Sequence, residues 1–193
     1  MNDRLSLILN FIEAIEPLKA VERATYLSDL SRHETDSDHT WHMAMLAILL
    51  NSELNFEVDL QKVLSLILIH DLCEIYAGDT FAHSPQYGDH EGEQQAVEKL
   101  SALLPQDLRD KILEYWCEFT FGPSPEAQFA RALDRLQALA QNIYSSGRVW
   151  KEHEVTEQMS RDLNHEAMLL DPILAESFER LYERANDEGL WPD

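Results

Sequence analysis

The sequence is poor in basic residues and has no long apolar run. Lys and Arg together number 15 against 36 Asp and Glu, so the formal net charge is −21. Phosphate repulsion therefore argues against a nucleic-acid polymer as the partner. A membrane-spanning helix needs about 18 consecutive apolar residues, and no such run is present. The N-terminal segment mixes acids with its apolar residues, unlike a signal peptide, so we expect a cytoplasmic protein without a membrane partner.

Cysteine is scarce as well. Cys73 and Cys117 form no Cys-x-x-Cys pair, and a cytosolic setting disfavours a disulfide, so we expect two buried thiols. Strand-like alternation, a glycine-rich phosphate loop, internal repeats and low-complexity linkers are also missing. What is present is 193 residues, 45% of them hydrophobic, which is enough for the core of one domain spanning residues 1–193.

Helical spacing of apolar residues runs through most of the chain. Ser37 is followed by an acid and is the expected N-cap of a helix over residues 38–50. Asp59 is the expected cap of the next helix, which continues to Ile75 and stops at Gly78. The pattern also predicts helices over residues 5–15, 91–104, 107–119, 126–144, 152–168 and 172–188, with a shorter one near 20–30. We therefore predict an all-α fold, a single-domain helical bundle.

His70 and Asp71 stand together at the end of a strongly apolar helical run. A charged aspartate in that position is costly to bury unless a partner compensates it. His39, in the preceding helix, and Asp134, in a later one, are also of the side-chain types that bind divalent cations. If these side chains converge, three separate helical segments build a metal site inside the bundle. The alternative is a helix end at which the doublet meets water.

His39 and Asp134, the two candidate ligands outside the doublet, also have ordinary structural interpretations. Taken alone, His39 is more often a partly buried structural histidine, and His42 on the next turn competes for the ligand role. Asp134 is unfavourable inside a helix, but a surface ion pair with Arg131 or Arg135 would also explain it.

Two more carboxylates follow the doublet. Glu74 lies four residues after His70, on the same helix face, and Asp79 comes directly after Gly78. Clustered carboxylates repel one another, and a bound cation relieves that repulsion. The alternative is a solvated acidic helix end, which is ordinary in a chain this acidic.

Three segments together resemble the HD-domain phosphohydrolases: RHETDSDHTWHMAMLAILL, IHDLCEIYAGD and FARALDRLQALAQ. They are most similar to the 5′-deoxynucleotidase branch, whose pattern resembles R-x-E-[ST]-x-[SA]-[DE]-H, then H-D-x-x-E-x-x-x-G-D, then a late K-x-x-D or A-x-D. The match covers residues 32–142 or so. The resemblance implies a helical bundle of the HD-domain type with a divalent cation held by His39, His70, Asp71 and Asp134.

The resemblance also implies roles for other residues. Glu74 would position or deprotonate the attacking water. Asp79 would line the sugar or act with Glu74, and in some relatives these two hold a second cation. Arg32 would contact the phosphate or support Glu34, so Arg32, Glu34 and Asp79 form the expected substrate side, completed by the loop over residues 79–90.

The chain departs from the branch in two places. The branch often has an arginine–tryptophan pair before the first motif, where Ala24-Thr25 stand with Tyr26 beside them. Relatives also tend to have basic residues before the helix that follows the loop, where this chain has Asp-His-Glu at 89–91. Both departures weaken the case for a nucleoside monophosphate specifically.

The residues and the resemblance together predict a metal-dependent phosphohydrolase that releases phosphate from a small phosphomonoester, with a deoxynucleoside 5′-monophosphate as the expected substrate. Two histidines and two carboxylates suit a transition metal (Mn, Co, Zn, Fe or Ni) better than Mg, without separating them. An HD-type phosphodiesterase, a nucleotide triphosphohydrolase, and a metal-stabilised nucleotide-binding regulatory module with little turnover are the alternatives. Base rate and family likeness favour a homodimer.

Overall fold

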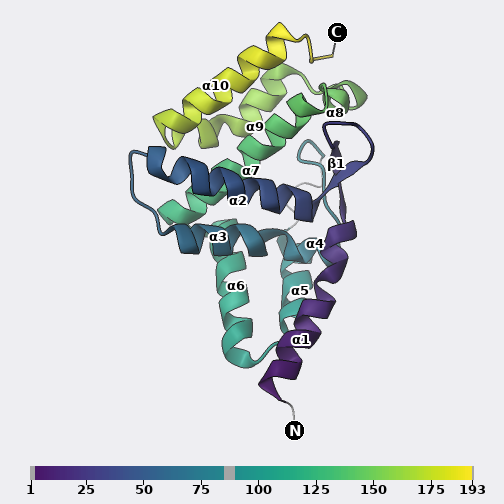
Figure 1. Cartoon of the computed structure of the whole chain (residues 1–193), viewed down its shortest axis with the longest axis vertical. Coiled ribbons are helices and arrows are strands. Elements are labelled where there is room, and N and C mark those ends of the chain that lie inside the picture. The colour runs from purple at the N-terminus through teal and green to yellow at the C-terminus, as the bar shows by residue number, and fades with distance from the viewer. Residues whose placement is uncertain (1–2, 85–89, 193) are drawn as a thin grey trace.

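Helix α7 (Pro125–Tyr144) runs through the middle of the molecule, and the other long helices pack around it (Figure 1). The structure is a computed structural model in which residues 3–84 and 90–192 are described. α7 begins where the Ser124 hydroxyl accepts a hydrogen bond from the Ala127 amide, with Pro125 in the first turn. Alanine and leucine side chains then face the core along its length, so α7 organises the packing.

Most of the described residues are helical, so the predicted all-α class is confirmed. The elements in chain order are α1 (Arg4–Ala14), η1 (Glu16–Ala20), β1 (Glu22–Tyr26), β2 (His33–Thr35), α2 (Asp36–Leu50), η2 (Asn51–Glu53), α3 (Leu60–Ile69), η3 (His70–Cys73), α4 (Glu74–Ala77), α5 (His90–Ser101), α6 (Gln106–Phe121), α7, α8 (Arg148–Glu152), α9 (Glu157–Leu169) and α10 (Pro172–Asp187), where η marks a 3₁₀ helix.

The segment near residues 20–30, expected as a short helix, is instead the first strand of a hairpin. β1 and β2 pair antiparallel with an irregular register between Glu22↔Thr35 and Tyr26↔His33. Tertiary contacts favour the strand, because Gln141 of α7 donates a hydrogen bond to the main-chain oxygen of Tyr26. The hairpin lies beside the N-terminal end of α2, and this position brings its side chains close to that end of the helix.

The helix predicted to continue to Ile75 is broken into three pieces. α3 begins at its predicted cap, Asp59, and ends at Ile69. The next four residues form the 3₁₀ helix η3, and α4 then ends at Gly78, whose φ of 79° favours glycine. The 3₁₀ turn is tighter than an α-helical turn, so it changes the directions in which the side chains of the doublet leave the backbone.

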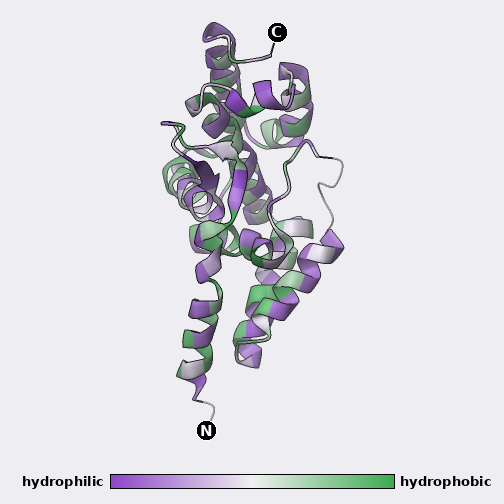
Figure 2. Cartoon of the chain, turned by 90° about the vertical axis from the view of Figure 1, so that its right-hand side faces the viewer, coloured by the Kyte–Doolittle hydropathy of each residue, from purple (hydrophilic) through white to green (hydrophobic). Residues whose placement is uncertain are grey.

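Two buried apolar clusters hold the helices together. The larger one lies around α7, between α2, α3 and α10, and the smaller one joins α1, α5 and α6 to η3. Most helices accordingly carry both hydrophilic and hydrophobic residues (Figure 2). Cys73 is buried in the smaller cluster as expected, whereas Cys117 is exposed on α6, which corrects the expectation of two buried thiols. Among the described helices, none has both the length and the apolar character needed to cross a membrane.

Candidate metal centre and active site

Three ligand-type side chains, His39, His70 and Asp71, meet at one point. One ligand atom from each lies within 4.8 Å of the others, and the two imidazole centroids are 5.7 Å apart. Asp134 joins them through His39, with its Oδ1 3.1 Å from His39 Nε2. The four residues predicted to hold a cation are therefore neighbours, although they come from α2, η3 and α7. His42, the alternative ligand, is not part of this group and lies 3.4 Å from the Gln137 amide nitrogen.

The Nδ1 atom of each imidazole, His39 and His70, makes a hydrogen bond to an oxygen acceptor. His39 Nδ1 is 2.5 Å from Gln137 Oε1, and His70 Nδ1 is 2.7 Å from a main-chain carbonyl oxygen one turn earlier. An oxygen acceptor requires a proton on Nδ1, so the lone pair of each neutral ring is on Nε2. Both Nε2 atoms are buried and have no hydrogen-bond partner in the part of the chain that the structure describes, and each faces a carboxylate oxygen of Asp134 or Asp71 at 3.0–3.1 Å. This donor set fits a divalent cation.

The charges at this point are strongly coupled. Burial opposes ionisation of Asp134, but the His39 imidazole at 3.1 Å and the charge of Arg135 hold the pKa of that carboxyl well below its usual range. Burial also opposes ionisation of Asp71, and the charge of His70 outweighs it and lowers the pKa of Asp71. Burial lowers the pKa of His70, but Asp71 more than compensates and raises it to about 9. A proton on His70 thus balances the metal-free site, and a metal ion displaces such protons when it binds.

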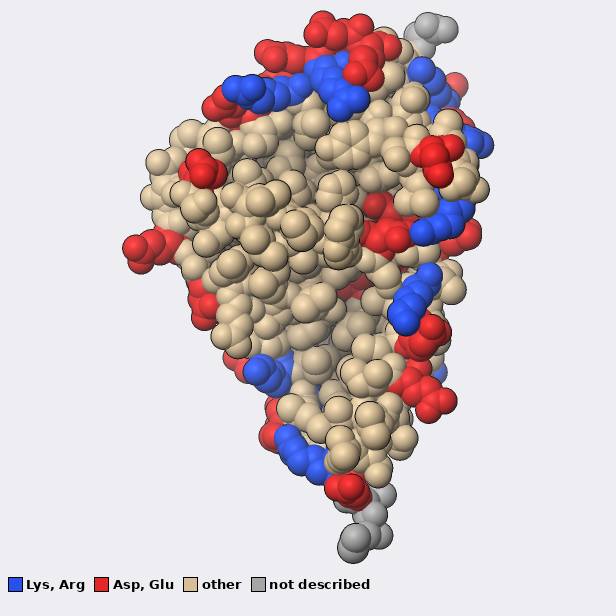
Figure 3. All heavy atoms as spheres, viewed as in Figure 1, with Lys and Arg blue, Asp and Glu red and all other residues tan. Residues whose placement is uncertain are grey.

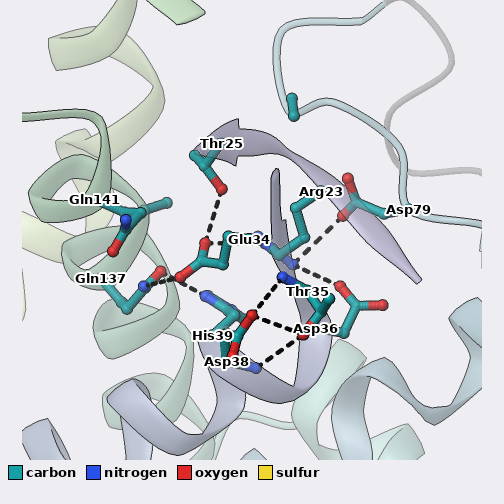
Figure 4. A network of polar contacts seen from close by, with 12 residues as sticks. Arg23, Thr25, Glu34, Thr35, Asp36, Asp38, His39, Asp79, Gln137 and Gln141 are labelled. Atoms are coloured by element: carbon teal, nitrogen blue, oxygen red, sulfur yellow. Dashed lines mark hydrogen bonds and ion pairs between the residues drawn. The ribbon is translucent and has the colours of Figure 1, made fainter. Parts of the chain in front are cut away.

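Arg23 is a site residue that the sequence-based prediction missed. Its Nη1 lies 3.3 Å from Asp36 Oδ1 and 3.4 Å from Asp79 Oδ1 (Figure 4). The same Nη1 is 3.3 Å from Asp71 Oδ2. Burial lowers the pKa of Arg23, but the charges of Asp71 and Asp79 outweigh it and hold that pKa above its usual value. The sequence offered one signal, because Arg23 is the single basic residue in the segment 20–30, which was predicted to be a helix.

Glu74 and Asp79 lie beside the candidate metal ligands and line a cavity of about 1030 Å³. Burial, then the negative charges of Asp71 and Asp79, raise the pKa of Glu74 to about 9. Burial also raises the pKa of Asp79, although the Arg23 guanidinium opposes the shift. Glu74 Oε2 is buried and has no hydrogen-bond partner among the described residues, so it is available to a water or a substrate.

Glu34, expected on the substrate side, is buried behind His39 and is absent from the cavity lining. Its Oε2 accepts a hydrogen bond from the Thr25 hydroxyl at 2.7 Å, and its Oε1 accepts one from Gln137 Nε2 at 2.7 Å. The structure thus holds Glu34 in the core, and its contact with substrate stays a prediction. The sequence motif gave the order of the residues, but the short strand β2 turns Glu34 inward toward α7.

Arg32, the expected phosphate contact, is also absent from the cavity lining. Its Nη1 lies 2.7 Å from Asp38 Oδ2, and its side chain is 47% exposed. Asp38 is the acidic member of the capping box at the start of α2, so Arg32 is drawn to the helix end and away from the ligands. The ion pair with Asp38 is thus the contact that the structure shows for the Arg32 guanidinium, and its contact with a phosphate stays a prediction.

Positively charged side chains also line the cavity. Arg131 and Arg135 of α7 line it, together with residues 80–83 of the loop after α4. Arg131 donates to two main-chain oxygens at the end of α6, at 2.6 and 2.9 Å. Burial, then the charges of Arg135 and His153, lower the pKa of His83. The loop was expected to complete the pocket; residues 80–83 line it, while Tyr87 and its neighbours over 85–89 lie outside the described residues.

The helical architecture and the neighbouring histidine and carboxylate side chains are those of a known class. The sequence matches the model of the HD domain over residues 15–169, and the chain therefore belongs to the HD domain family. The resemblance drawn from the three motif segments is thus confirmed.

Within that family, the chain is similar to proteins with stated activities. It is 30% identical to the human 5′-deoxynucleotidase HDDC2 over 137 residues, covering 69% of this chain and 66% of the relative. The match to the 5′-deoxynucleotidase hdd1 of Schizosaccharomyces pombe is 27% identical over 149 residues, with 73% and 74% covered. The alignments thus span just under two thirds of the human protein's own length.

A solved structure matches almost the whole chain. A predicted metal-dependent phosphohydrolase from Magnetospirillum magnetotacticum has a TM-score of 0.91 and 35% sequence identity, covering 98% of this chain and 96% of that one. This match extends beyond the residues that carry the motifs, so the likeness includes the C-terminal helices.

Proposed function

We propose that the chain is a metal-dependent phosphohydrolase that releases phosphate from a small phosphomonoester, with a deoxynucleoside 5′-monophosphate as substrate. The observation that carries the proposal is the convergence of two imidazole Nε2 atoms and two ionised carboxylates beside a cavity that also holds a separate buried carboxyl, Glu74. A structural site needs only its ligands, whereas Glu74 and Asp79 are additional groups suited to chemistry. The names of the relatives support the same substrate class.

His39, His70, Asp71 and Asp134 would hold the cation. A divalent cation in this position supplies Lewis acidity to a phosphate oxygen and lowers the pKa of a bound water. Two imidazole nitrogens and two carboxylates suit Mn, Co, Zn, Fe or Ni better than Mg. Asp71 and Asp134 remain ionised in the buried site, so both can bind the metal without first losing a proton.

Three side chains would act on the substrate. Glu74 Oε2 has no hydrogen-bond partner among the described residues, and a bound cation would offset the negative charges that raise the pKa of Glu74. Glu74 would then be ionised and would accept the proton of the attacking water. Arg23 has its guanidinium at the cavity wall, where its planar donors can bind two phosphate oxygens at once. Asp79 lines the same cavity and would accept a hydrogen bond from a sugar hydroxyl.

The size and charge of the cavity favour one second candidate. A volume of about 1030 Å³ and the cationic wall formed by Arg131 and Arg135 could also hold a nucleotide with more than one phosphate. Such a substrate would make the protein a triphosphohydrolase or a phosphodiesterase. The products distinguish these, because a monophosphatase releases phosphate and a nucleoside, whereas a triphosphohydrolase leaves pyrophosphate or a triphosphate fragment.

The test is a screen of metal-stripped protein with each divalent cation added back. Deoxynucleoside and ribonucleoside monophosphates, triphosphates and sugar phosphates are offered separately, and the products are identified. Asp134→Ala serves as the control, since it removes a candidate ligand that lies 3.1 Å from His39. We expect metal-dependent phosphate release from deoxynucleoside monophosphates that Asp134→Ala abolishes. Turnover without added metal, or equal turnover by the variant, would contradict the proposal.

We also propose that the protein is a cytoplasmic homodimer that pairs through the outer face of α2. On this face Trp41, Met45, Ile48 and Leu49 recur at helical spacing and are 66%, 37%, 49% and 63% exposed. The surface over α2 and α3 is nearly free of charged side chains (Figure 3). Two chains of net charge −21 repel each other, so an uncharged face is where a second copy can approach.

The oligomeric state provides the check. We expect a mass of twice 22.3 kDa in sedimentation or light scattering, and a mass near 22.3 kDa for Met45→Asp. Leu169→Asp is the matched control, because Leu169 is an exposed leucine (72%) on α9, outside this face. A monomeric parent protein, or a dimer that Met45→Asp leaves intact, would contradict this interface.

A further inference from the structure

A buried chain of hydrogen bonds lies behind His39, on the side away from its free nitrogen. His39 Nδ1 is 2.5 Å from Gln137 Oε1, Gln137 Nε2 is 2.7 Å from Glu34 Oε1, and Glu34 Oε2 is 2.7 Å from the Thr25 hydroxyl (Figure 4). His39 and Gln137 are 0% exposed, and Glu34 is 2% exposed. These hydrogen bonds connect α2, the helix of His39, to α7 and to both strands of the hairpin.

The direction of each hydrogen bond in this series follows from the Glu34 carboxylate at one end. The two oxygens of a carboxylate accept and cannot donate, so Glu34 requires the N–H side of Gln137. The second N–H of Gln137 Nε2 points to His42 Nδ1, which lies 3.4 Å away. Both sets of neighbours therefore fix the amide with its oxygen toward His39.

This orientation decides which nitrogen of His39 is free. An amide oxygen needs a proton on Nδ1, which leaves the lone pair on Nε2, the atom that faces Asp134 at 3.1 Å. A flipped amide would offer N–H to Nδ1, so the proton would move to Nε2. Metal binding would then have to displace that proton.

Glu34 also connects this chain to the cation at the cavity wall. Arg23 Nε lies 3.8 Å from Glu34 Oε2, the same oxygen that accepts the hydrogen bond from the Thr25 hydroxyl. One buried carboxylate thus contacts both the group that orients His39 and the strand that carries Arg23.

We propose that Glu34 and Gln137 are positioning residues, in which Glu34 fixes the Gln137 amide and Gln137 holds His39 in the Nδ1-protonated tautomer. This inference rests on the metal site of the proposed function but does not depend on its substrate. Groups that hold a ligating histidine in this manner typically contribute 10–100-fold, roughly, to metal affinity.

The first test replaces the central amide. We expect Gln137→Leu to weaken binding of Co²⁺ about 10–100-fold, measured by titration of the stripped protein. ¹⁵N NMR of the imidazoles in the metal-free protein should show His39 losing its uniform Nδ1-protonated form. Gln141→Leu is the matched control, because Gln141 lies one turn further along α7, is 6% exposed, and donates a hydrogen bond to the Tyr26 carbonyl oxygen, away from His39. It should leave both readings unchanged.

The second test exchanges the two side chains. Gln137→Glu alone places two carboxylates against each other and should weaken Co²⁺ binding. Adding Glu34→Gln restores a donor between them, since the new amide at position 34 can donate to position 137, which still accepts from His39. We therefore expect the double variant to recover Co²⁺ affinity and the tautomer. A purely structural role would predict no such recovery.

The outcomes separate this inference from the proposed function. If Gln137→Leu keeps the Co²⁺ affinity and tautomer of the parent, or if the double variant is no better than Gln137→Glu, the positioning role is wrong. If the parent binds Co²⁺ and responds to these variants but releases no phosphate, the proposed function fails and the positioning role stands. If the parent does not bind Co²⁺, the ¹⁵N NMR spectra of the metal-free proteins still test the positioning role, because they show whether Gln137→Leu changes the tautomer of His39.

Discussion

Glu74 is the side chain on which turnover should depend most. Glu74→Gln keeps the shape of the side chain and cannot accept a proton, so we expect phosphate release to fall by about 10²–10⁴-fold. Metal content should be unchanged, because Glu74 is not one of the four candidate ligands. Steady-state kinetics with metal analysis of the same sample is the measurement, and unchanged turnover would show that Glu74 is not the base.

The two arginines near the start of the chain give a matched pair. Arg23→Gln removes a cation at the cavity wall, and we expect kcat/KM to fall about 10–100-fold, as for loss of a charged hydrogen bond. Arg32→Gln removes an exposed ion pair to Asp38 and should leave kcat/KM within error. If Arg32→Gln has the larger effect, Arg32 is the phosphate contact after all.

At the residue scale, the sequence was informative where chemistry and local spacing coincide. His70 and Asp71 end an apolar run, where polar side chains need a partner. The structure places their ligand atoms next to that of His39. The sequence was not informative for Glu34 and Arg32, because a motif gives the order of residues but not the side of a strand on which each lies. Arg23 was missed for a related reason, since its role depends on strand pairing that its segment does not reveal.

At the scale of elements, the long helices were predictable because each has an apolar face at helical spacing over several turns. The hairpin was not, because β1 and β2 are short and their pairing depends on contacts with α7. Helix ends were less certain. The predicted cap Ser37 lies inside α2, and the actual cap is Thr35, which forms a capping box with Asp38.

This capping box should matter for both stability and the metal site. Thr35→Ala removes the hydroxyl that accepts from the Asp38 amide, so the free energy of unfolding should fall by about 1 kcal/mol. Co²⁺ affinity should fall as well, since His39 lies in the turn that Thr35 caps.

Thr156→Ala is the control for the loss of a cap, because Thr156 caps α9 and is not among the residues at the metal site. It should cost a similar free energy, measured by urea unfolding, without a change in Co²⁺ affinity. A loss of affinity in both variants would point to global destabilisation as the cause.

At the scale of the whole molecule, metal binding should stabilise the fold. The candidate ligands belong to α2, η3 and α7, so only the folded chain brings them together. A ligand at 100 times its Kd stabilises by about 2.7 kcal/mol, which for a chain of this size raises Tm by about 5–10 °C. Thermal unfolding with and without Co²⁺ measures the shift, and Asp134→Ala should remove it.

The position of Asp134 on the central helix has a consequence for synthesis of the chain. His39, His70 and Asp71 leave the ribosome before α7 is made, and at about 5–20 residues per second the delay between His70 and Asp134 is about 3–13 s. During that delay the nascent chain exposes an incomplete set of ligands and the apolar faces of α2 and α3 that α7 later covers. Chaperone contact and capture of a wrong metal ion should therefore be concentrated in this interval, and completion of α7 ends both risks together.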